Sequence, residues 1–202
     1  LPKRDPEDAV DVLIRTILSQ NTSDVNSHRA FANLKKRFPN WEALINAPLE
    51  EIEKEIRCGG ISYIKARRIK EILQRLREEK GAISLSFLNH LPLEKAKEYL
   101  LSLPGVGEKT ADCVLLFSFA KPAFPVDTHI HRIVNRWGIF KNDLSPKEIS
   151  LLFEANLPSN RFLSLHLNLI RLGREICRPH NPLCHICPLR DFCNYYEVRL
   201  SS

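Results

Sequence analysis

The chain has 202 residues, of which 44% are hydrophobic and 27% charged, so it can bury a sizeable core and is not a disordered or fibrous protein. No apolar run reaches the roughly 18 residues that a membrane-spanning helix requires, which predicts a protein outside the membrane. Thirty Lys and Arg against 24 Asp and Glu give a formal net charge of +6, and this excess favours a polyanionic partner such as DNA or RNA.

The first predicted helix begins close to the N-terminus. Asp5 is a typical N-cap residue, and Pro6 is a typical first helical residue. Apolar residues then recur at the spacing of one helix face: Val10, Leu13, Ile14, Ile17 and Leu18. The segment therefore predicts an amphipathic helix with one face on the core.

Similar patterns continue along the chain. Asp24 is expected to cap a second helix and Ser62 to open another, with two shorter helices between them. Their apolar stripes are Phe31, Leu34 and Phe38 after Asp24, and Ile69, Ile72, Leu73 and Leu76 after Ser62. Further helices are predicted over 93–102, 108–119, 127–137, 146–156 and 159–176. Strand patterns are almost absent, so the predicted fold class is all-α.

A glycine-rich turn joins two of the predicted helices within residues 96–118. It contains Pro104, Gly105 and Gly107. Because glycine has no side chain, the backbone amides of 105–108 can approach a phosphate, and the positive dipole end of the next helix attracts it. Any antiparallel helix pair can share such a turn. The segment nevertheless favours a clamp that binds DNA without reading its sequence.

Lys109 lies in the first turn of the helix that follows. The helix dipole and the neighbouring amides disfavour an ammonium group there, so the free amine is more available. Such an amine is a Schiff-base nucleophile. From this segment alone, however, an exposed lysine that contacts phosphate is the simpler interpretation.

Asp127 stands at the start of the predicted helix over 127–137, soon after Pro125. An N-cap aspartate, worth about 1 kcal/mol, is one interpretation. A carboxylate near a lysine and a sugar can instead support positive charge on the sugar or move protons, as in glycosidases. The residue alone leaves both interpretations open.

Four of the six cysteines lie close together with the spacing C-x6-C-x2-C-x5-C: Cys177, Cys184, Cys187 and Cys193. Three interpretations compete: a zinc site, a [4Fe-4S] cluster, and two disulfides. Disulfides are the weakest, because Cys58 and Cys113 stand singly in helical, apolar contexts typical of reduced thiols. Zinc sites prefer two CxxC pairs and this segment has one, so the spacing mildly favours the cluster.

Together, four features resemble the endonuclease III family of helix-hairpin-helix DNA glycosylases. They are ILSQNTSD at 17–24, LPGVGEKTA at 103–111, VDTHIHRIVNR at 126–136 and the cysteine series. The resemblance extends from about residue 8 to about residue 195. It implies an all-α, helix-hairpin-helix DNA glycosylase fold with a six-helix barrel domain, an iron–sulfur cluster domain and an interdomain groove that holds DNA.

The resemblance also implies domain boundaries and residue roles. We expect residues 8–120 to form the barrel domain, and 121–202 with 1–7 to form the cluster domain. Lys109 matches the family's nucleophile, which attacks C1′ and permits β-elimination, and Asp127 matches its essential carboxylate. Cys177, Cys184, Cys187 and Cys193 match the ligands of the [4Fe-4S] cluster. The resemblance thus favours the cluster over zinc and the nucleophile over the phosphate contact.

In this family, residues of two loops fill the space left by a flipped nucleotide. By position, Gln20 or Asn21 matches the first of these loops, and Ile61 the second. An amide can bond the orphaned base, and an apolar wedge can replace lost stacking. Gly105, Gly107, Arg178 and His180 are expected to contact phosphates, whereas we interpret His129 and Arg132 as structural.

The predicted function is a base-excision DNA glycosylase with AP lyase activity that removes oxidised pyrimidines from duplex DNA. Lys109 separates it from adenine-mismatch relatives, which lack a lysine at this position. Glycosylases for thymine or uracil opposite guanine, or for 5-methylcytosine, are alternatives within the enzyme class. A non-catalytic DNA-binding module is the alternative outside it, but such a module has no need for both Lys109 and Asp127. We expect an intracellular monomer, in the cytoplasm or nucleoid if the source is prokaryotic.

Overall fold

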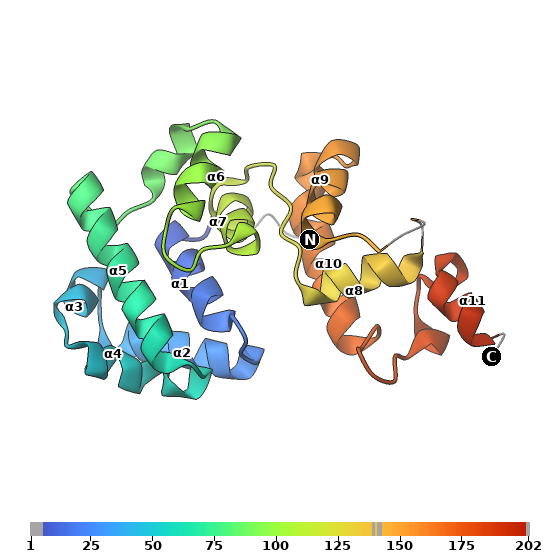
Figure 1. Ribbon diagram of the computed structural model, residues 1–202, viewed down its shortest axis with the longest axis horizontal. Coiled ribbons are helices and arrows are strands. Elements are labelled where there is room, and N and C mark those ends of the chain that lie inside the picture. Colours follow the sequence, from blue (N-terminus) through green and yellow to red (C-terminus); the bar gives the residue numbers. More distant parts are fainter. Residues whose placement is uncertain (1–5, 139, 141–142, 201–202) are drawn as a thin grey trace. The chain divides into compact units, whose positions relative to one another are not determined.

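The computed structural model describes residues 6–138, 140 and 143–200, without the side chains of 198–200 (Figure 1). Every regular element in these ranges is a helix, which confirms the predicted all-α class. No helix in this part of the chain is long and apolar enough to cross a membrane. The chain divides into two compact units, with the boundary between Ala120 and Lys121.

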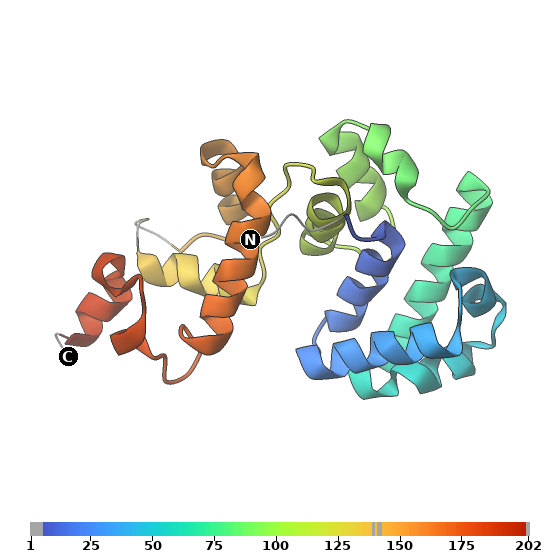
Figure 2. The ribbon, with the colours of Figure 1, turned by 180° about the vertical axis from the view of Figure 1, so that it is seen from behind.

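The first unit contains seven α-helices among its described residues (Figure 1, Figure 2). They are α1 (Ala9–Ser19), α2 (Asp24–Arg37), α3 (Trp41–Asn46), α4 (Leu49–Ile56), α5 (Ser62–Lys80), α6 (Leu93–Leu101) and α7 (Glu108–Phe119), with short 3-10 turns at Arg57–Gly59 and Ser86–His90.

Helix α1 is the centre of this unit and packs against α2, α5 and α7. Its predicted stripe is fully covered, and Leu13, Ile14, Ile17 and Leu18 have no exposed surface. Burying each such side chain contributes about 1.5–3 kcal/mol. The stripe predicted on α5, Ile69, Ile72, Leu73 and Leu76, is equally buried and is likewise confirmed.

Two predicted helix starts were wrong. Helix α1 begins at Ala9, because the Asp8 carboxylate accepts the Asp11 N–H at 2.9 Å, and Pro6 precedes the helix. Asp5 lies outside the described residues. Asp24 is the first residue of α2 instead of its cap, since the Ser23 hydroxyl accepts the Asn26 N–H. In both places a neighbouring polar side chain provides the cap.

Glu7 belongs with the first unit and not, as expected for residues 1–7, with residues 121–202. Its backbone N–H donates to the carbonyl of Phe117 at 3.3 Å. Its carboxylate pairs with Arg15 on α1. The chain that leads into α1 is therefore held against the end of α7.

The second unit contains four α-helices among its described residues: α8 (Thr128–Trp137), α9 (Pro146–Asn156), α10 (Phe162–Glu175) and α11 (Asn194–Leu200). Its core forms around Phe124, whose ring contacts Phe153 and Phe162 edge-on at centroid distances of 4.8 and 5.6 Å. The helix predicted over 159–176 is divided into a 3-10 turn, Ser159–Arg161, and α10. The cysteine segment between α10 and α11 contains only two short 3-10 turns, Cys184–Ile186 and Arg190–Phe192.

Candidate functional site

The predicted hairpin is present as α6, a tight turn and α7. Gly105 has a φ of +73°, a left-handed conformation that glycine adopts without strain. A Cβ at this position would lie 2.6 Å from Cδ of Arg68, a flexible side chain that can move aside. The positive φ therefore explains the glycine at 105.

Gly107 is different, because nothing in the folded chain requires a glycine there. Its φ of −102° suits any residue. A Cβ on Gly107 would have no atom within 4 Å among the described residues. Gly107 is the N-cap of α7 and provides no side chain to cap the helix amides. These first-turn amides and the open space beside them form an anion-binding arrangement.

Replacing Gly107 with alanine should therefore weaken DNA binding without destabilising the fold. We expect about a tenfold loss of affinity for duplex DNA, because the methyl group would keep a phosphate away from the amides. Fluorescence anisotropy with a labelled duplex measures the affinity, and thermal unfolding provides the control. Unchanged affinity would contradict close approach of phosphate to this turn.

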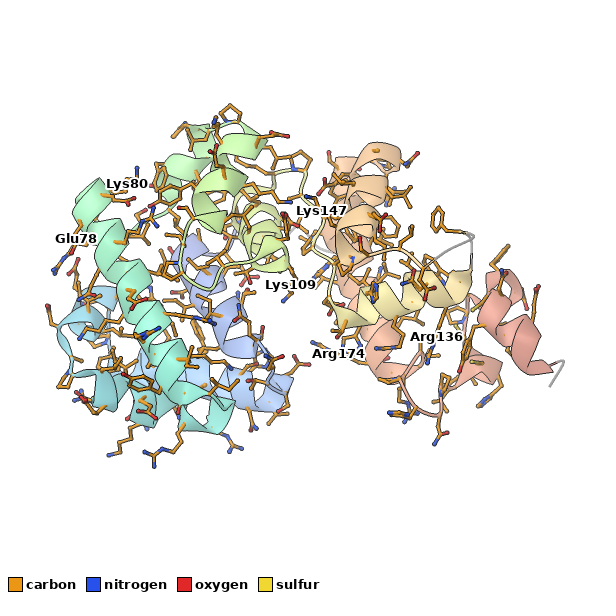
Figure 3. The ribbon with its side chains drawn as sticks, in the orientation of Figure 1. Glu78, Lys80, Lys109, Arg136, Lys147 and Arg174 are labelled. Carbon is orange, nitrogen blue, oxygen red and sulfur yellow. The ribbon has the colours of Figure 1, made fainter. Side chains whose placement is uncertain are left out.

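Lys109 is in the first turn of α7, where Figure 3 labels it. The residue is half-buried. Its Nζ makes no hydrogen bond or ion pair with any residue in the described ranges. Within that part of the chain, the amine therefore does not stabilise the fold through a polar contact.

The acidic residues beside Lys109 on α7 are paired with a different lysine. Lys97, on α6, has its Nζ 2.8 Å from Asp112 Oδ1 and 2.8 Å from Glu108 Oε2. Burial lowers the pKa of Lys97, but its hydrogen bonds to Asp112 and Glu108 outweigh this, so that the pKa lies above its ordinary value. The ion pairs join the two helices of the hairpin and engage the carboxylates nearest in sequence to Lys109.

Changing Lys97 to methionine should destabilise the first unit by about 2 kcal/mol, because Asp112, only 2% exposed, loses its cationic partner. Changing Glu108 to glutamine should cost less than about 1 kcal/mol, since its side chain is 46% exposed. Urea unfolding of the two variants and the wild type measures the difference. Equal stabilities would show that the buried ion pair does not hold the hairpin.

Asp127 is the N-cap of α8, as the simpler interpretation predicted. Its Oδ1 accepts the N–H of Ile130 at 2.8 Å. The side chain is half-buried. No other hydrogen bond or ion pair to its carboxylate is found within the described residues. One oxygen thus holds the helix start while the other is available to an external group.

Two loops of the first unit contain the predicted wedge residues. Asn21 is exposed with a φ of +52°, and Ile61 is 55% exposed with a φ of +47°. Gln20 is instead tied to the hairpin, because its Nε2 donates to the Gly105 carbonyl at 3.0 Å and lies 3.5 Å from the Thr110 hydroxyl. The structure therefore places Gln20 against the glycine turn of the hairpin and leaves Asn21 at the loop tip.

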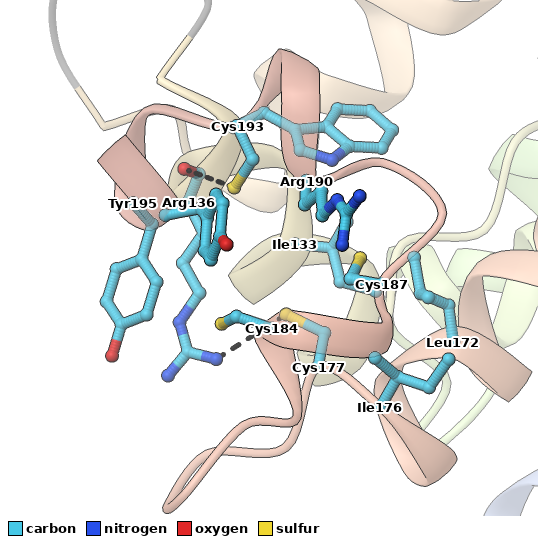
Figure 4. A pocket seen from close by; sticks show the side chains of 12 residues that line it. Ile133, Arg136, Leu172, Ile176, Cys177, Cys184, Cys187, Arg190, Cys193 and Tyr195 are labelled. Carbon is cyan, nitrogen blue, oxygen red and sulfur yellow. Dashed lines mark hydrogen bonds between the residues drawn. The ribbon is translucent and has the colours of Figure 1, made fainter. Parts of the chain in front are cut away.

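The four clustered cysteines are brought together in the second unit. They line one small, mostly apolar cavity together with Ile133, Leu172 and Ile176 (Figure 4). Burial raises the pKa of the Cys187 thiol, a hydrogen bond from the Leu189 backbone partly lowers it, and the other three cysteines raise it further. In the described ranges, no three His, Cys, Asp or Glu side chains are arranged to hold a single metal ion. None of the six cysteines forms a disulfide, so the disulfide alternative is not realised.

Two arginines of α8 contact the cysteine segment. Arg132 donates to the Cys177 carbonyl through Nε at 3.0 Å and through a terminal nitrogen at 2.8 Å. Arg136 lies 3.4 Å from Cys177 Sγ and donates to the Arg178 carbonyl at 2.7 Å. These contacts agree with the structural role expected for Arg132. The role of Arg136 was not predicted, although a separation of four residues places both arginines on one helix face.

Arg178 and His180 are both exposed in the loop that follows Cys177. The Arg178 backbone is held by Arg136, while no side-chain contact of Arg178 or His180 is found within the described residues. Both side chains are accessible to a ligand. His129, on α8, accepts a hydrogen bond from Arg132 at Nδ1 over 3.0 Å and packs against Gly173, in agreement with a structural role.

Residues 14–159 match the model of the HhH-GPD superfamily base excision DNA repair protein. A protein of Arabidopsis thaliana that is named as a putative DNA glycosylase is 45% identical over 138 residues, which cover 68% of this chain and 47% of the relative. Endonuclease III of Thermotoga maritima is 38% identical over 192 residues, or 95% of this chain and 85% of the relative. The chain thus spans about half of the first relative and most of the second.

Among solved structures, a non-covalent endonuclease III–DNA complex matches with a TM-score of 0.82. That alignment is 30% identical and covers 97% of this chain and 87% of the solved chain. The sequence relative and the solved structure are thus both endonuclease III proteins, and each match covers nearly the whole chain.

Proposed function

The chain belongs to the HhH-GPD superfamily of base excision DNA repair proteins, and we propose that it acts as a DNA glycosylase and AP lyase with Lys109 as its nucleophile. The observation that carries this proposal is the Lys109 amine in the first turn of α7, directly after the open glycine turn, which pairs with none of the residues that the structure describes. A phosphate bound at the turn would bring the adjacent deoxyribose within reach of this amine. The protein would act on DNA inside the cell.

The proposed reaction starts with attack of the Lys109 amine on C1′ of the damaged nucleotide. The C1′–N bond to the base breaks, and the base leaves with the bonding electrons and takes up a proton. The C1′–O4′ bond then breaks, O4′ takes up a proton and becomes a hydroxyl group, and the nitrogen lone pair forms the protonated imine between Nζ and C1′. Removal of a C2′ proton allows the C3′–O bond to break, and the 3′ phosphate leaves. Hydrolysis of the imine restores the free amine.

Asp127 is proposed to assist base departure. Its carboxylate would support the positive charge that develops at C1′ or accept a proton from the attacking amine. The arrangement of its two oxygens supports this role, because the N-cap bond to Ile130 fixes the carboxylate through Oδ1 alone.

We propose that Cys177, Cys184, Cys187 and Cys193 hold a [4Fe-4S] cluster. Four thiols around one cavity fit this group. When bound, the cluster supplies four covalent bonds that organise the loops between α10 and α11. Arg136, beside Cys177 Sγ, would offset part of the negative charge of the thiolates.

Protein purified aerobically should therefore be brown and contain about four iron and four sulfide per chain. Substituting Cys187 by serine should remove the colour and the iron, whereas serine at Cys113, a buried thiol of α7, should leave both unchanged. Colorimetric iron and sulfide assays check this. A colourless protein with one zinc per chain would contradict the assignment.

The remaining contacts are proposed from exposure and charge. Asn21 and Ile61, at the two loop tips, would enter the duplex where the damaged nucleotide leaves the stack. Arg178 and His180 would contact phosphates. Because Gln20 is bound to the hairpin, we assign the inserting amide to Asn21.

Oxidised pyrimidines are the proposed substrates. Duplexes that contain thymine glycol, uracil opposite guanine, thymine opposite guanine, 5-methylcytosine or an abasic site should be incubated with the protein and borohydride, which reduces an imine to a stable adduct. We expect adducts with thymine glycol and the abasic site. Adducts with a mismatch or 5-methylcytosine duplex in place of thymine glycol would favour the alternative substrates. Base release without any adduct would contradict the lyase mechanism.

A further inference from the structure

A lysine that takes no part in the proposed chemistry is buried beneath both loop tips. Lys65, on α5, is 3% exposed. Its Nζ donates to the Leu18 carbonyl at 2.9 Å, the Thr22 hydroxyl at 2.6 Å and the Gly59 carbonyl at 2.9 Å. All three ammonium donors are therefore satisfied.

This environment is unusual for a buried cation. The described residues place no carboxylate within ion-pair distance of Lys65, so only carbonyl and hydroxyl dipoles stabilise its charge. Leu18 lies in the last turn of α1, where the negative end of the helix dipole favours a cation. Burial nevertheless lowers the pKa of Lys65, which reflects the cost of removing the ammonium from water.

The three acceptors lie in or next to the two loops that contain the proposed wedges. Leu18 and Thr22 flank Gln20 and Asn21, and Gly59 stands two residues before Ile61. The Thr22 hydroxyl also donates to the Gly59 carbonyl, which joins the loops directly. Both figures of the ribbon show the end of α1 and the start of α5 near one another in the first unit (Figure 1, Figure 2).

Each loop tip has a backbone conformation that needs support. A left-handed φ is a genuine outlier for a β-branched residue such as Ile61, and it is uncommon for Asn21. Ile61 is 55% exposed, so packing in the core does not compensate for the strain. Strain at an exposed apolar residue indicates that the surrounding structure holds the tip for a ligand.

We propose that Lys65 is a positioning residue that holds the tips at Asn21 and Ile61 at a fixed separation, ready to enter the DNA duplex. The inference rests on the proposed function. One ammonium group bonded to both loops couples them, so that the amide and the apolar wedge enter the duplex together. Without the Lys65 ammonium group, each loop tip moves independently of the other. Both tips must then become ordered when they bind the duplex.

The test compares Lys65→Met with a matched control, Lys70→Met. Lys70 also lies on α5 and donates to a carbonyl of another segment, that of Ala47 at 2.5 Å, but it touches neither loop. Single-turnover rates are measured on a duplex with thymine glycol and on a single strand with an abasic site, which needs no wedge. The single-turnover rate of Lys65→Met should fall about 10- to 100-fold on the duplex and less than about threefold on the single strand.

Equal losses on both substrates, or no loss on the duplex, would overturn the proposal. Lys70→Met should behave as wild type on both. If Lys65→Met does not fold, Thr22→Val and Thr22→Ser replace it: valine removes the hydroxyl that joins the loops, and serine restores it. The duplex rate should fall with valine and recover with serine, and equal rates for the two would also overturn the proposal.

Hydrogen exchange of the free protein separates this inference from the proposed function. Lys65→Met should speed exchange in residues 19–23 and 57–61 together, while Lys70→Met leaves both at the wild-type rate. Unchanged exchange in both loops would contradict the positioning role even in an active enzyme. If the wild-type protein forms no borohydride-trapped adduct, the proposed function is contradicted. Hydrogen exchange in the two loops would still show whether Lys65 holds them.

Discussion

Changing Lys109 to alanine should abolish the borohydride-trapped adduct while DNA binding remains within about threefold of wild type. The amine is the proposed nucleophile, and no other side chain in its part of α7 can form an imine. The phosphate-binding amides of the turn belong to the backbone and remain in place. Gel analysis of the adduct and anisotropy with the same abasic duplex measure the two quantities.

Lys95→Ala is the matched control for this experiment. Lys95 is a lysine of the same hairpin, on α6, and its ion pair with Glu98 is exposed. Its substitution should leave both trapping and binding unchanged. An adduct retained in Lys109→Ala would move the nucleophile elsewhere, and loss of trapping in Lys95→Ala would indicate a general effect of charge.

Asp127→Asn should slow base release by about 10²- to 10⁴-fold without destabilising the protein. Asparagine caps helices as well as aspartate does, so the bond to the Ile130 N–H is kept while the negative charge is lost. The chemical role is thereby separated from the structural one. Single-turnover release of thymine glycol and thermal unfolding measure the two effects.

Asp127→Ala provides the comparison, because it removes both the charge and the cap. Asp127→Ala should release the base as slowly as Asp127→Asn, and its free energy of unfolding should also be lower by about 1 kcal/mol. A release rate for Asp127→Asn close to that of wild type would leave Asp127 with its structural role alone.

Local signals predicted much of the fold. Helices α7 and α9 begin and end at the predicted residues, since Gly107 and Ser145 mark their starts clearly. At α1 and α2, two candidate caps lie close together in sequence, and only the folded backbone decides which one accepts the first-turn amide. Helix α11 follows the cysteine segment and has no strong pattern of its own.

The parts of the candidate site that depend on contacts between residues far apart in the sequence could not be predicted. The contacts of Arg136 with the cysteine segment join residues about 40 positions apart, which a local pattern cannot reveal. Lys65 did leave a signal. It stands four residues before Ile69 and seven before Ile72, on the apolar stripe of α5, where a lysine is out of place and indicates a buried cation.

The central claim, that Lys109 forms the covalent bond to DNA, is tested most directly by mapping the trapped adduct. The wild-type protein is reduced with borohydride on an abasic duplex and digested with protease and nuclease, and the modified peptide is sequenced by mass spectrometry. We expect a sugar remnant on Lys109, within the peptide that begins the second helix of the hairpin. A remnant on any other residue, or no modified peptide from a protein that cleaves the abasic strand, would contradict it.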